Sequence, residues 1–211
     1  MLHVQEIGPR KGKPQWQKVY LSDGSVIELP KTVILQQQLW VGKQIGTEDL
    51  ETLHHLSEYH RAQEAALHYV GYKARTEYQV RQHLSKKGFK TPVIDQVIAF
   101  LHRYCYLNDA EFAREFIRSY LKRKPSGYYR VRYELRRRGI AEHLIEAALA
   151  PFEDDIHQHH LAREAALRKL RALQHKPAAK QRQLLIQFLQ RRGFTWDTIR
   201  PIIEELFDDL Q

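Results

Sequence analysis

Apolar residues follow two different periods along this chain, which separate a short β-rich start from a long helical remainder. From Trp16 to Leu29 the sequence reads WQKVYLSDGSVIEL, two β-prone runs on either side of Ser-Asp-Gly-Ser. Glycine accepts the positive φ that a tight turn requires, so the segment predicts a β-hairpin that turns at Gly24. The run from Leu39 to Val41 is expected to add a strand.

The helical period begins at Thr47, in the segment GTEDLETLHHL. Apolar residues there recur every three or four positions, which places them on one face of an α-helix. The same spacing continues far along the chain, and we expect helix to dominate it from here on. A clear later example consists of Phe112, Phe116, Ile117, Tyr120 and Leu121.

One six-residue phrase occurs three times, as LSKKGF at 84–89, LRRRGI at 135–140 and LQRRGF at 189–194. When the copies are aligned on their glycines, apolar residues also match downstream, and similar alanine-led segments match upstream. The period of 49 to 54 residues is typical of tandem helical repeats, whose units bury their apolar faces partly against their neighbours. The sequence therefore predicts three copies of a three-helix unit.

Helix boundary signals agree with this division. Asn108 followed by Glu111 forms a capping box, and Thr76 with Gln79 repeats it in the first copy. The glycine of each phrase stands where a helix would end through a left-handed residue, a conformation that costs glycine little. Each phrase is therefore predicted to be a helix C-terminus.

These patterns predict a mainly α-helical fold with a small N-terminal β-hairpin region. The three repeats are expected to form an elongated, curved bundle. The expected ranges are 1–57 for the hairpin with a short helix, then 58–107, 108–153 and 154–211 for the three repeats.

Composition limits the partners and the compartment. The chain has 34 Lys and Arg against 25 Asp and Glu, a formal charge of +9, which favours an acidic partner such as nucleic acid or an acidic protein groove. Cys105 is the only cysteine, so an internal disulfide is ruled out and a reducing compartment fits. The start MLHVQEIGPRKGK lacks the apolar core of a signal peptide, and no apolar run is long enough to span a membrane. We expect a cytoplasmic protein with no membrane contact.

The basic pairs beside the three glycines have an ordinary structural explanation. Cations in the last turn of a helix interact favourably with its exposed carbonyl groups, by about 0.3 to 1 kcal/mol each. At about 100° per residue, however, Lys86, Arg137 and Arg191 point roughly 200° away from the apolar leucine of their phrase. They are predicted to be surface charges.

The predicted helix from Tyr128 to Arg138 combines arginine with tyrosine. Its core stripe is expected to be Tyr128, Val131 and Leu135. The opposite face suits phosphates and stacked bases, or the carboxylates of an acidic protein. Alternatively, its tyrosines pack on a neighbouring repeat and its arginines are solvated. The residues expected on that face are Tyr129, Arg130, Tyr133, Arg136 and Arg137.

The candidate residues for binding a partner or nucleic acid are the cations and tyrosines in and near these helix ends. They are Arg81, Lys86, Lys87, Lys122, Arg123, Tyr129, Arg130, Arg132, Tyr133, Arg136, Arg137, Arg138, Arg191 and Arg192.

No comparable set of residues indicates catalysis. The group from Asp154 to His160 suggests a metal site, but on a helix only His157 and His160 share a face, so a charged helix start explains it. Glycine-rich phosphate loops and known nucleophile motifs are absent from the sequence. We expect no catalytic residue, no metal site and no cofactor.

The stretch from Tyr106 to Leu149, YLNDAEFAREFIRSYLKRKPSGYYRVRYELRRRGIAEHLIEAAL, resembles the central pattern of the RecX family of regulatory proteins. The first and third copies support the resemblance, which covers about residues 60 to 205. The N-terminal hairpin region is less diagnostic. The third copy departs from the pattern by a longer loop, from Gln174 to Gln183.

The resemblance implies a non-enzymatic regulator that binds the RecA nucleoprotein filament. It implies inhibition of RecA ATPase, strand exchange and coprotease activity, which dampens recombination and the SOS response. The expected protein acts as a monomer and binds single- or double-stranded DNA weakly.

A stand-alone DNA-binding protein without sequence specificity is the alternative. Three-helix units also form the frame of helix-turn-helix proteins, and the helix from Tyr128 to Arg138 is basic. Its outer face lacks the Asn and Gln that read adenine, which disfavours sequence-specific recognition but not phosphate binding.

Overall fold

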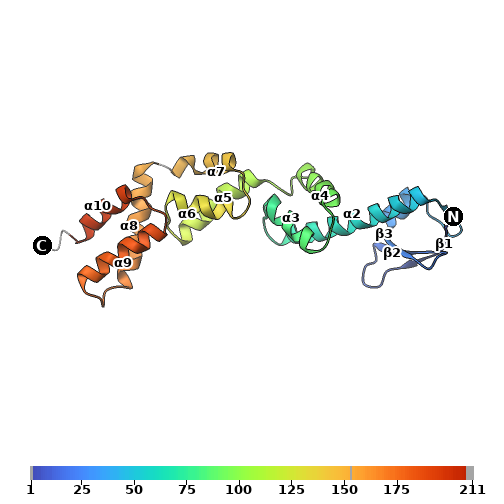
Figure 1. The fold of residues 1–211 in the computed structure, drawn as a ribbon, viewed down its shortest axis with the longest axis horizontal. Helices are drawn as coiled ribbons and strands as arrows, with labels where there is room; N and C mark the ends of the chain where they lie inside the picture. The colour runs from blue at the N-terminus through green and yellow to red at the C-terminus, as the bar shows by residue number, and fades with distance from the viewer. Residues whose placement is uncertain (1, 153, 208–211) are drawn as a thin grey trace. The chain divides into compact units, whose positions relative to one another are not determined.

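The computed structural model describes residues 2–152 and 154–207, which form two compact units. The first unit contains residues 2–74 and 80–107, and the second contains 75–79 together with everything described after 107. The predicted architecture is confirmed: three three-helix repeats follow a small antiparallel sheet (Figure 1). The curvature expected of the bundle stays a prediction, as do the domain boundaries.

The N-terminal sheet has the strand order β3-β2-β1-β4 with every neighbouring pair antiparallel. The predicted hairpin is confirmed, because β2 and β3 pair with Val19 opposite Ile27 and Gly24 takes a φ of 82°. Alternating residues of the hairpin point inward to an apolar core that also receives Leu53. The strands are β1 (Leu2–Pro9), β2 (Trp16–Leu21), β3 (Val26–Pro30) and β4 (Gln44–Ile45).

The prediction of a strand from Leu39 to Val41 is wrong. Helix α1 (Lys31–Gln36) precedes this segment and ends through Gln38 at a φ of 48°, after which the N–H of Leu39 bonds the carbonyl of Ile34 at 3.0 Å. Leu39 is buried by this helix ending, and Trp40 and Val41 lie in an exposed turn. The apolar run therefore reflects one core residue beside a turn, not a pleated strand.

Helix α2 (Thr47–Tyr72) belongs to two cores of the first unit. Near its start, Leu53 packs in the core of the sheet, and the Ser57 hydroxyl donates a 2.7 Å hydrogen bond to the carbonyl of Glu28. Farther along, Ala62 and Ala66 are fully buried in the core of repeat 1. The boundary expected after residue 57 falls inside this continuous helix, which Figure 1 shows running from the sheet into the first bundle.

Each repeat contains three helices around its own apolar core, as predicted. The leucine that opens each phrase is fully buried, at Leu84, Leu135 and Leu189. Repeat 1 uses the later part of α2 with α3 (Glu77–Lys86) and α4 (Thr91–Arg103). Repeat 2 uses α5 (Asp109–Arg123), α6 (Tyr128–Arg136) and α7 (Glu142–Leu149), followed by the short 3₁₀ turn η1 (Ala150–Phe152). Repeat 3 uses α8 (Asp155–Arg171), α9 (Ala178–Arg191) and α10 (Trp196–Phe207).

The repeated phrase forms the same helix ending in all three copies. Its glycine has a φ of 85°, 75° or 79°, at Gly88, Gly139 and Gly193. In each copy the N–H of the residue after the glycine bonds the carbonyl of the phrase's leucine, five residues back, at 3.3 Å. This is the left-handed C-terminal motif that the sequence predicts.

The capping box predicted at Thr76 is confirmed, and the one predicted at Asn108 is confirmed in its first half. The N–H of Glu111 donates to the Asn108 side chain at 2.9 Å, and the Glu111 carboxylate accepts from Arg114 at 2.6 Å. The N–H of Gln79 donates to the Thr76 hydroxyl at 3.2 Å, and the N–H of Thr76 donates to the Gln79 side-chain oxygen at 3.3 Å. Backbone groups that the first helical turn leaves unpaired are thus satisfied locally.

In the second unit, the first residues of another helix pack against the glycine turns at Gly139 and Gly193. The Thr76 hydroxyl donates to the carbonyl of Arg138 at 2.7 Å, and a Cβ on Gly139 would lie 2.2 Å from Cβ of Tyr78. In the same way, the N–H of Gly127 bonds the carbonyl of Arg192 at 2.9 Å. The glycines therefore serve close packing as well as backbone conformation.

The long loop expected from Gln174 to Gln183 is wrong in its extent. Helix α9 already begins at Ala178, so much of the insertion is helical. This helix has 14 residues, against 10 in α3 and 9 in α6. The extra residues of repeat 3 therefore lengthen its middle helix. The last four residues expected in repeat 3 lie outside the described residues.

Replacing Gly139 with Ala should destabilise the protein far more than replacing Gly88 with Ala. Both glycines have positive φ, which costs an L-residue about 1 to 2 kcal/mol, but only at Gly139 would the new methyl meet another chain segment. We expect a loss of about 1 kcal/mol for Gly88→Ala and about 3 kcal/mol or more for Gly139→Ala. Urea unfolding of both variants measures the difference, and equal losses would contradict the packing described at Gly139.

Candidate partner-binding face of repeat 2

The exposed side of α6 carries a line of aromatic and cationic side chains. Tyr129, Tyr133 and Arg137 are spaced by four residues, so they stack along one side of the helix. The tyrosines are 62% and 52% exposed, and the Arg137 guanidinium lies 5.8 Å from the Tyr133 ring centroid. We call Tyr129, Tyr133, Arg136 and Arg137 the α6 face. As predicted, it lies opposite buried Val131 and Leu135.

Beneath this face, Glu134 is a buried carboxylate held by two arginines. Its side chain is only 9% exposed, and it accepts bonds of 2.8 Å from both Arg130 and Arg138. Burial by itself would raise the pKa of Glu134, but the hydrogen bond from Arg138 and the neighbouring guanidinium charges outweigh it and lower the pKa. Arg138 also lies 4.2 Å from the ring centroid of Phe116, so its cation is turned toward the interior of repeat 2.

Arg130 does not have the fully exposed position expected of it. Its side chain is 40% exposed and paired with Glu134, and its backbone N would lie 2.4 Å from a Cβ built on Gly193. The hydrogen bond to Tyr120 is the main reason that the pKa of Arg130 is raised. The Arg130 side chain therefore has its partners inside repeat 2, while its backbone lies close to the Gly193 turn of repeat 3, and Arg130 is not a free surface cation.

A second network joins α6 to the acidic side chains of α7. The Arg136 Nε bonds a carboxylate oxygen of Glu142 at 2.7 Å, and Arg132 pairs with both Glu142 and Glu146. The hydrogen bond from Arg136 is the main cause that lowers the pKa of Glu142. Arg136 nevertheless keeps 56% of its side chain exposed, so it can still reach a partner.

The structure thus divides the predicted cations into two groups. Five of them form ion pairs with carboxylates of the chain: Arg81, Arg130, Arg132, Arg136 and Arg138. The other seven show no ion pair within residues 2–152 and 154–207: Lys86, Lys87, Lys122, Arg123, Arg137, Arg191 and Arg192.

Most of the seven are also exposed. Lys86, Arg137 and Arg191, the three predicted to face outward, are all exposed. Arg192 is half-buried, since its guanidinium lies 4.9 Å from the ring centroid of Phe188. Arg123 is exposed but donates from Nε to the carbonyl of Ser119. The cations best placed to meet a partner are therefore Lys86, Lys87, Lys122, Arg137 and Arg191.

Sequence reasoning missed Glu134, although its spacing carries a signal. It lies four residues after Arg130 and four before Arg138, the separation at which helix side chains meet. A lone acid within such a basic helix indicates an internal ion pair. Among the described residues, no cluster of three or more His, Cys, Asp or Glu could hold a metal ion, and none of the helices has the length and apolar character needed to cross a membrane.

Comparisons with known proteins place this fold. Family models described as the first, second and third three-helix domains of RecX match residues 62–101, 108–149 and 158–203. The Regulatory protein RecX of Prosthecochloris aestuarii is 33% identical over 150 residues, covering 71% of this chain and 96% of that protein. The Regulatory protein RecX of Bacillus subtilis is 29% identical, covering 98% of this chain and 78% of that protein.

Solved structures give the same result. A crystal structure of regulatory protein RecX matches with a TM-score of 0.74 and 22% identity, over 99% of this chain and 100% of that one. RecX from Lactobacillus salivarius matches with a TM-score of 0.62 and 25% identity, over 73% and 98%. Fold and relatives together define a regulatory protein built from three consecutive three-helix domains. The chain belongs to the RecX family.

Replacing Glu134 with Gln should destabilise the protein by about 1 to 3 kcal/mol at neutral pH, because two arginines lose the carboxylate between them. This estimate is reduced for the partial exposure of both arginines. Since the folded-state pKa of Glu134 is lowered, its contribution is complete above the ordinary carboxyl pKa and is lost as the pH falls through the folded-state value.

The matched control is Glu115→Gln, which removes an exposed carboxylate paired with Arg118 on α5. It should change stability by less than about 0.5 kcal/mol. Thermal unfolding of both variants between neutral and acidic pH measures the effect. A Glu134→Gln variant whose deficit stayed constant down to low pH would contradict the proposed role of the charge.

Proposed function

We propose that this chain binds a RecA recombinase filament assembled on DNA and inhibits its ATPase, strand-exchange and coprotease activities. In the cell this would dampen recombination and the SOS response. Membership in the RecX family is the observation that carries the proposal, because relatives over nearly the whole chain are named regulatory proteins.

The surface chemistry supports binding to an acidic target. Arg137 in repeat 2, Arg191 in repeat 3 and the Lys86–Lys87 pair in repeat 1 are exposed cations without an ion pair among the described side chains. Each of these cations lies in the same type of helix ending, just before its glycine. The three repeats therefore carry their exposed charges at equivalent positions. A target with repeated carboxylates or phosphates could bind each of these positions in turn.

Direct DNA binding is the alternative function, and the α6 face supports it. Arginine beside exposed tyrosine suits phosphates and bases, and phosphate contacts need no base-specific side chain. Such binding would depend steeply on salt concentration. It would also require the protein to cover the DNA before it displaced RecA.

RecA ATPase on single-stranded DNA separates the two functions. The protein is added at moderate salt and far below the DNA concentration in nucleotides. Binding to the filament predicts strong inhibition at that ratio, since one bound protein affects the filament around it. Competition for DNA predicts little inhibition until the strand is nearly covered. Inhibition only near saturation would count against the proposed function.

The double variant Lys122→Ala/Arg137→Ala should weaken inhibition about thirtyfold, since each of the two lost charged hydrogen bonds costs roughly 1 kcal/mol. Its thermal stability should stay near wild type, because both side chains are exposed and neither has an ion pair in the described chain. The inhibition constant against RecA ATPase provides the measurement.

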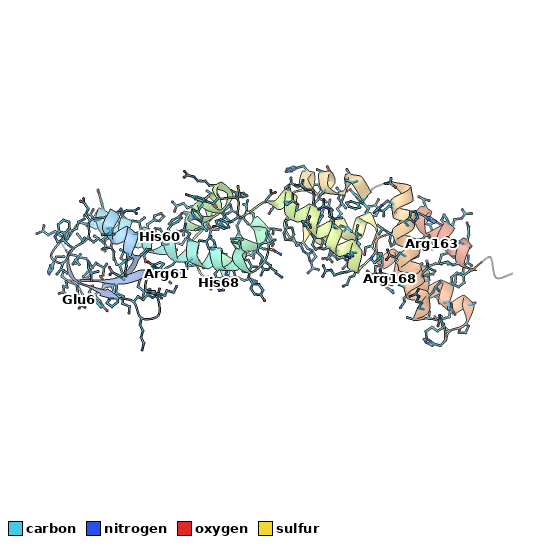
Figure 2. The ribbon with its side chains drawn as sticks, turned by 180° about the vertical axis from the view of Figure 1, so that it is seen from behind. Glu6, His60, Arg61, His68, Arg163 and Arg168 are labelled. Atoms are coloured by element: carbon cyan, nitrogen blue, oxygen red, sulfur yellow. The ribbon has the colours of Figure 1, made fainter. Side chains whose placement is uncertain are left out.

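The control is Arg163→Ala/Arg168→Ala on α8, which removes the same charge (Figure 2). Those arginines pair with Glu205 and Glu164 and belong to a different helix of the second unit. The control should inhibit almost as well as wild type. Equal losses in both double variants would indicate that only net charge matters and would contradict a specific role for the exposed cations of repeat 2.

A further inference from the structure

Helix α4 of repeat 1 ends in a cluster of three aromatic rings. Phe100 is half-buried and contacts both Tyr104, at a centroid distance of 4.8 Å, and Tyr106, at 6.5 Å with the rings 22° from parallel. The two tyrosines remain 57% and 52% exposed. We call Phe100, Tyr104 and Tyr106 the α4 aromatic cluster; it belongs to the first unit and shares no residue with the α6 face.

An unusual backbone conformation holds the cluster together. Cys105, between the two tyrosines, has a φ of 57°, in the region that favours glycine. The N–H of Tyr106 bonds the carbonyl of Leu101 at 2.8 Å, which repeats the helix ending of the three phrases without their glycine. This turn brings Tyr104 and Tyr106 to the same phenylalanine. An apolar contact such as that between Phe100 and Tyr106 often accompanies a left-handed helix ending. That contact alone does not explain why both tyrosine rings stay more than half exposed.

The chain segment that forms the cluster carries a cation. From Gln96 to Asn108 it contains Arg103 but no Asp or Glu, with Asp95 and Asp109 on either side. Asp95 is paired with Arg81 at 2.5 Å. The Arg103 guanidinium lies 5.9 Å from the ring centroid of Tyr104.

We propose that the α4 aromatic cluster is a stacking surface for the unpaired bases of a single-stranded nucleic acid, with Arg103 placed to contact the phosphates. Exposed aromatic rings beside a cation are the combination that single-strand-binding proteins use, because every base presents a planar face. Stacking of this type requires neither a base-specific side chain nor a deep pocket.

The composition of the surface favours bases over an apolar protein partner. In repeat 1, residues 58–107, every large exposed apolar side chain is a tyrosine: Tyr72, Tyr78, Tyr104 and Tyr106. A surface that docks an apolar helix or strand would present a contiguous aliphatic patch, which this region does not expose. The proposal requires neither RecA nor the α6 face, so it stands apart from the proposed regulatory function.

The test measures binding to a fluorescent oligo-dT of about 15 nucleotides by anisotropy, without RecA. The variant Tyr104→Leu/Tyr106→Leu keeps apolar contact with Phe100 but removes both ring faces. It should bind about tenfold more weakly than wild type. The conservative variant Tyr104→Phe/Tyr106→Phe should stay within about twofold, and so should Tyr72→Leu, which removes a tyrosine that is 85% exposed elsewhere in the unit.

Two further measurements distinguish stacking from general effects. An abasic strand of equal length, and a duplex, should bind the leucine variant and wild type equally, because neither offers free base faces. Cys105 is exposed and is the only cysteine, so bound oligo-dT should slow its reaction with a thiol reagent, and duplex should not. Thermal unfolding confirms that the leucine variant is folded.

Three outcomes would overturn the proposal. One is wild-type affinity of the folded leucine variant for oligo-dT. Another is an equal loss of affinity for oligo-dT, duplex and abasic strand. The third is unchanged oligo-dT binding together with weaker binding to RecA filaments, which would identify the cluster as a protein contact.

Discussion

The hydrogen bond from the residue after each phrase's glycine to the carbonyl of its leucine is the constraint on which the repeats depend. It closes the middle helix, keeps the leucine fully buried and turns the chain toward the third helix in the same way three times. The left-handed glycine that makes this bond possible has no side chain. A helix start can therefore approach the turn closely, as Tyr78 does at Gly139 and Arg130 does at Gly193.

That same ending decides which cations are available. Once the leucine faces the core, the first arginine of the pair, such as Arg137, must face solvent. The second cation lies nearer the interior and takes internal partners where the turn is packed, as Arg138 does with Glu134 and Phe116. At Gly88 nothing in the described chain lies within 4 Å of an added Cβ, and there the second cation, Lys87, is exposed.

Much of the fold could be predicted because its signals are local. Capping at Asn108, the left-handed glycines and the hairpin turn at Gly24 each depend on residues a few positions apart. Predictions were wrong for two different reasons. At Leu39 the deciding contact is local, but the helix ending uses Gln38 at positive φ where a glycine would have signalled it. At Arg130 the deciding contact is distant, because its backbone packs against the turn of another repeat at Gly193.

The residue types of the candidate site could be predicted, but which of its cations are left unpaired for a partner could not. Helical spacing places Arg136 and Arg137 on one exposed side, yet it cannot show that Arg136 is paired with Glu142 on the next helix. The α4 aromatic cluster was missed because its turn uses cysteine in place of the expected glycine. Ring contacts across such a turn depend on backbone conformation more than on spacing.

Helix α2 has a consequence for how the first unit comes apart. The single helix α2 contributes Leu53 to the core of the sheet and Ala62 to the core of repeat 1. The unfolding of either core would therefore remove packing from a helix that the other core also uses. Loosening of the sheet, for example, would take packing away from the start of α2, the same helix whose later residues support repeat 1.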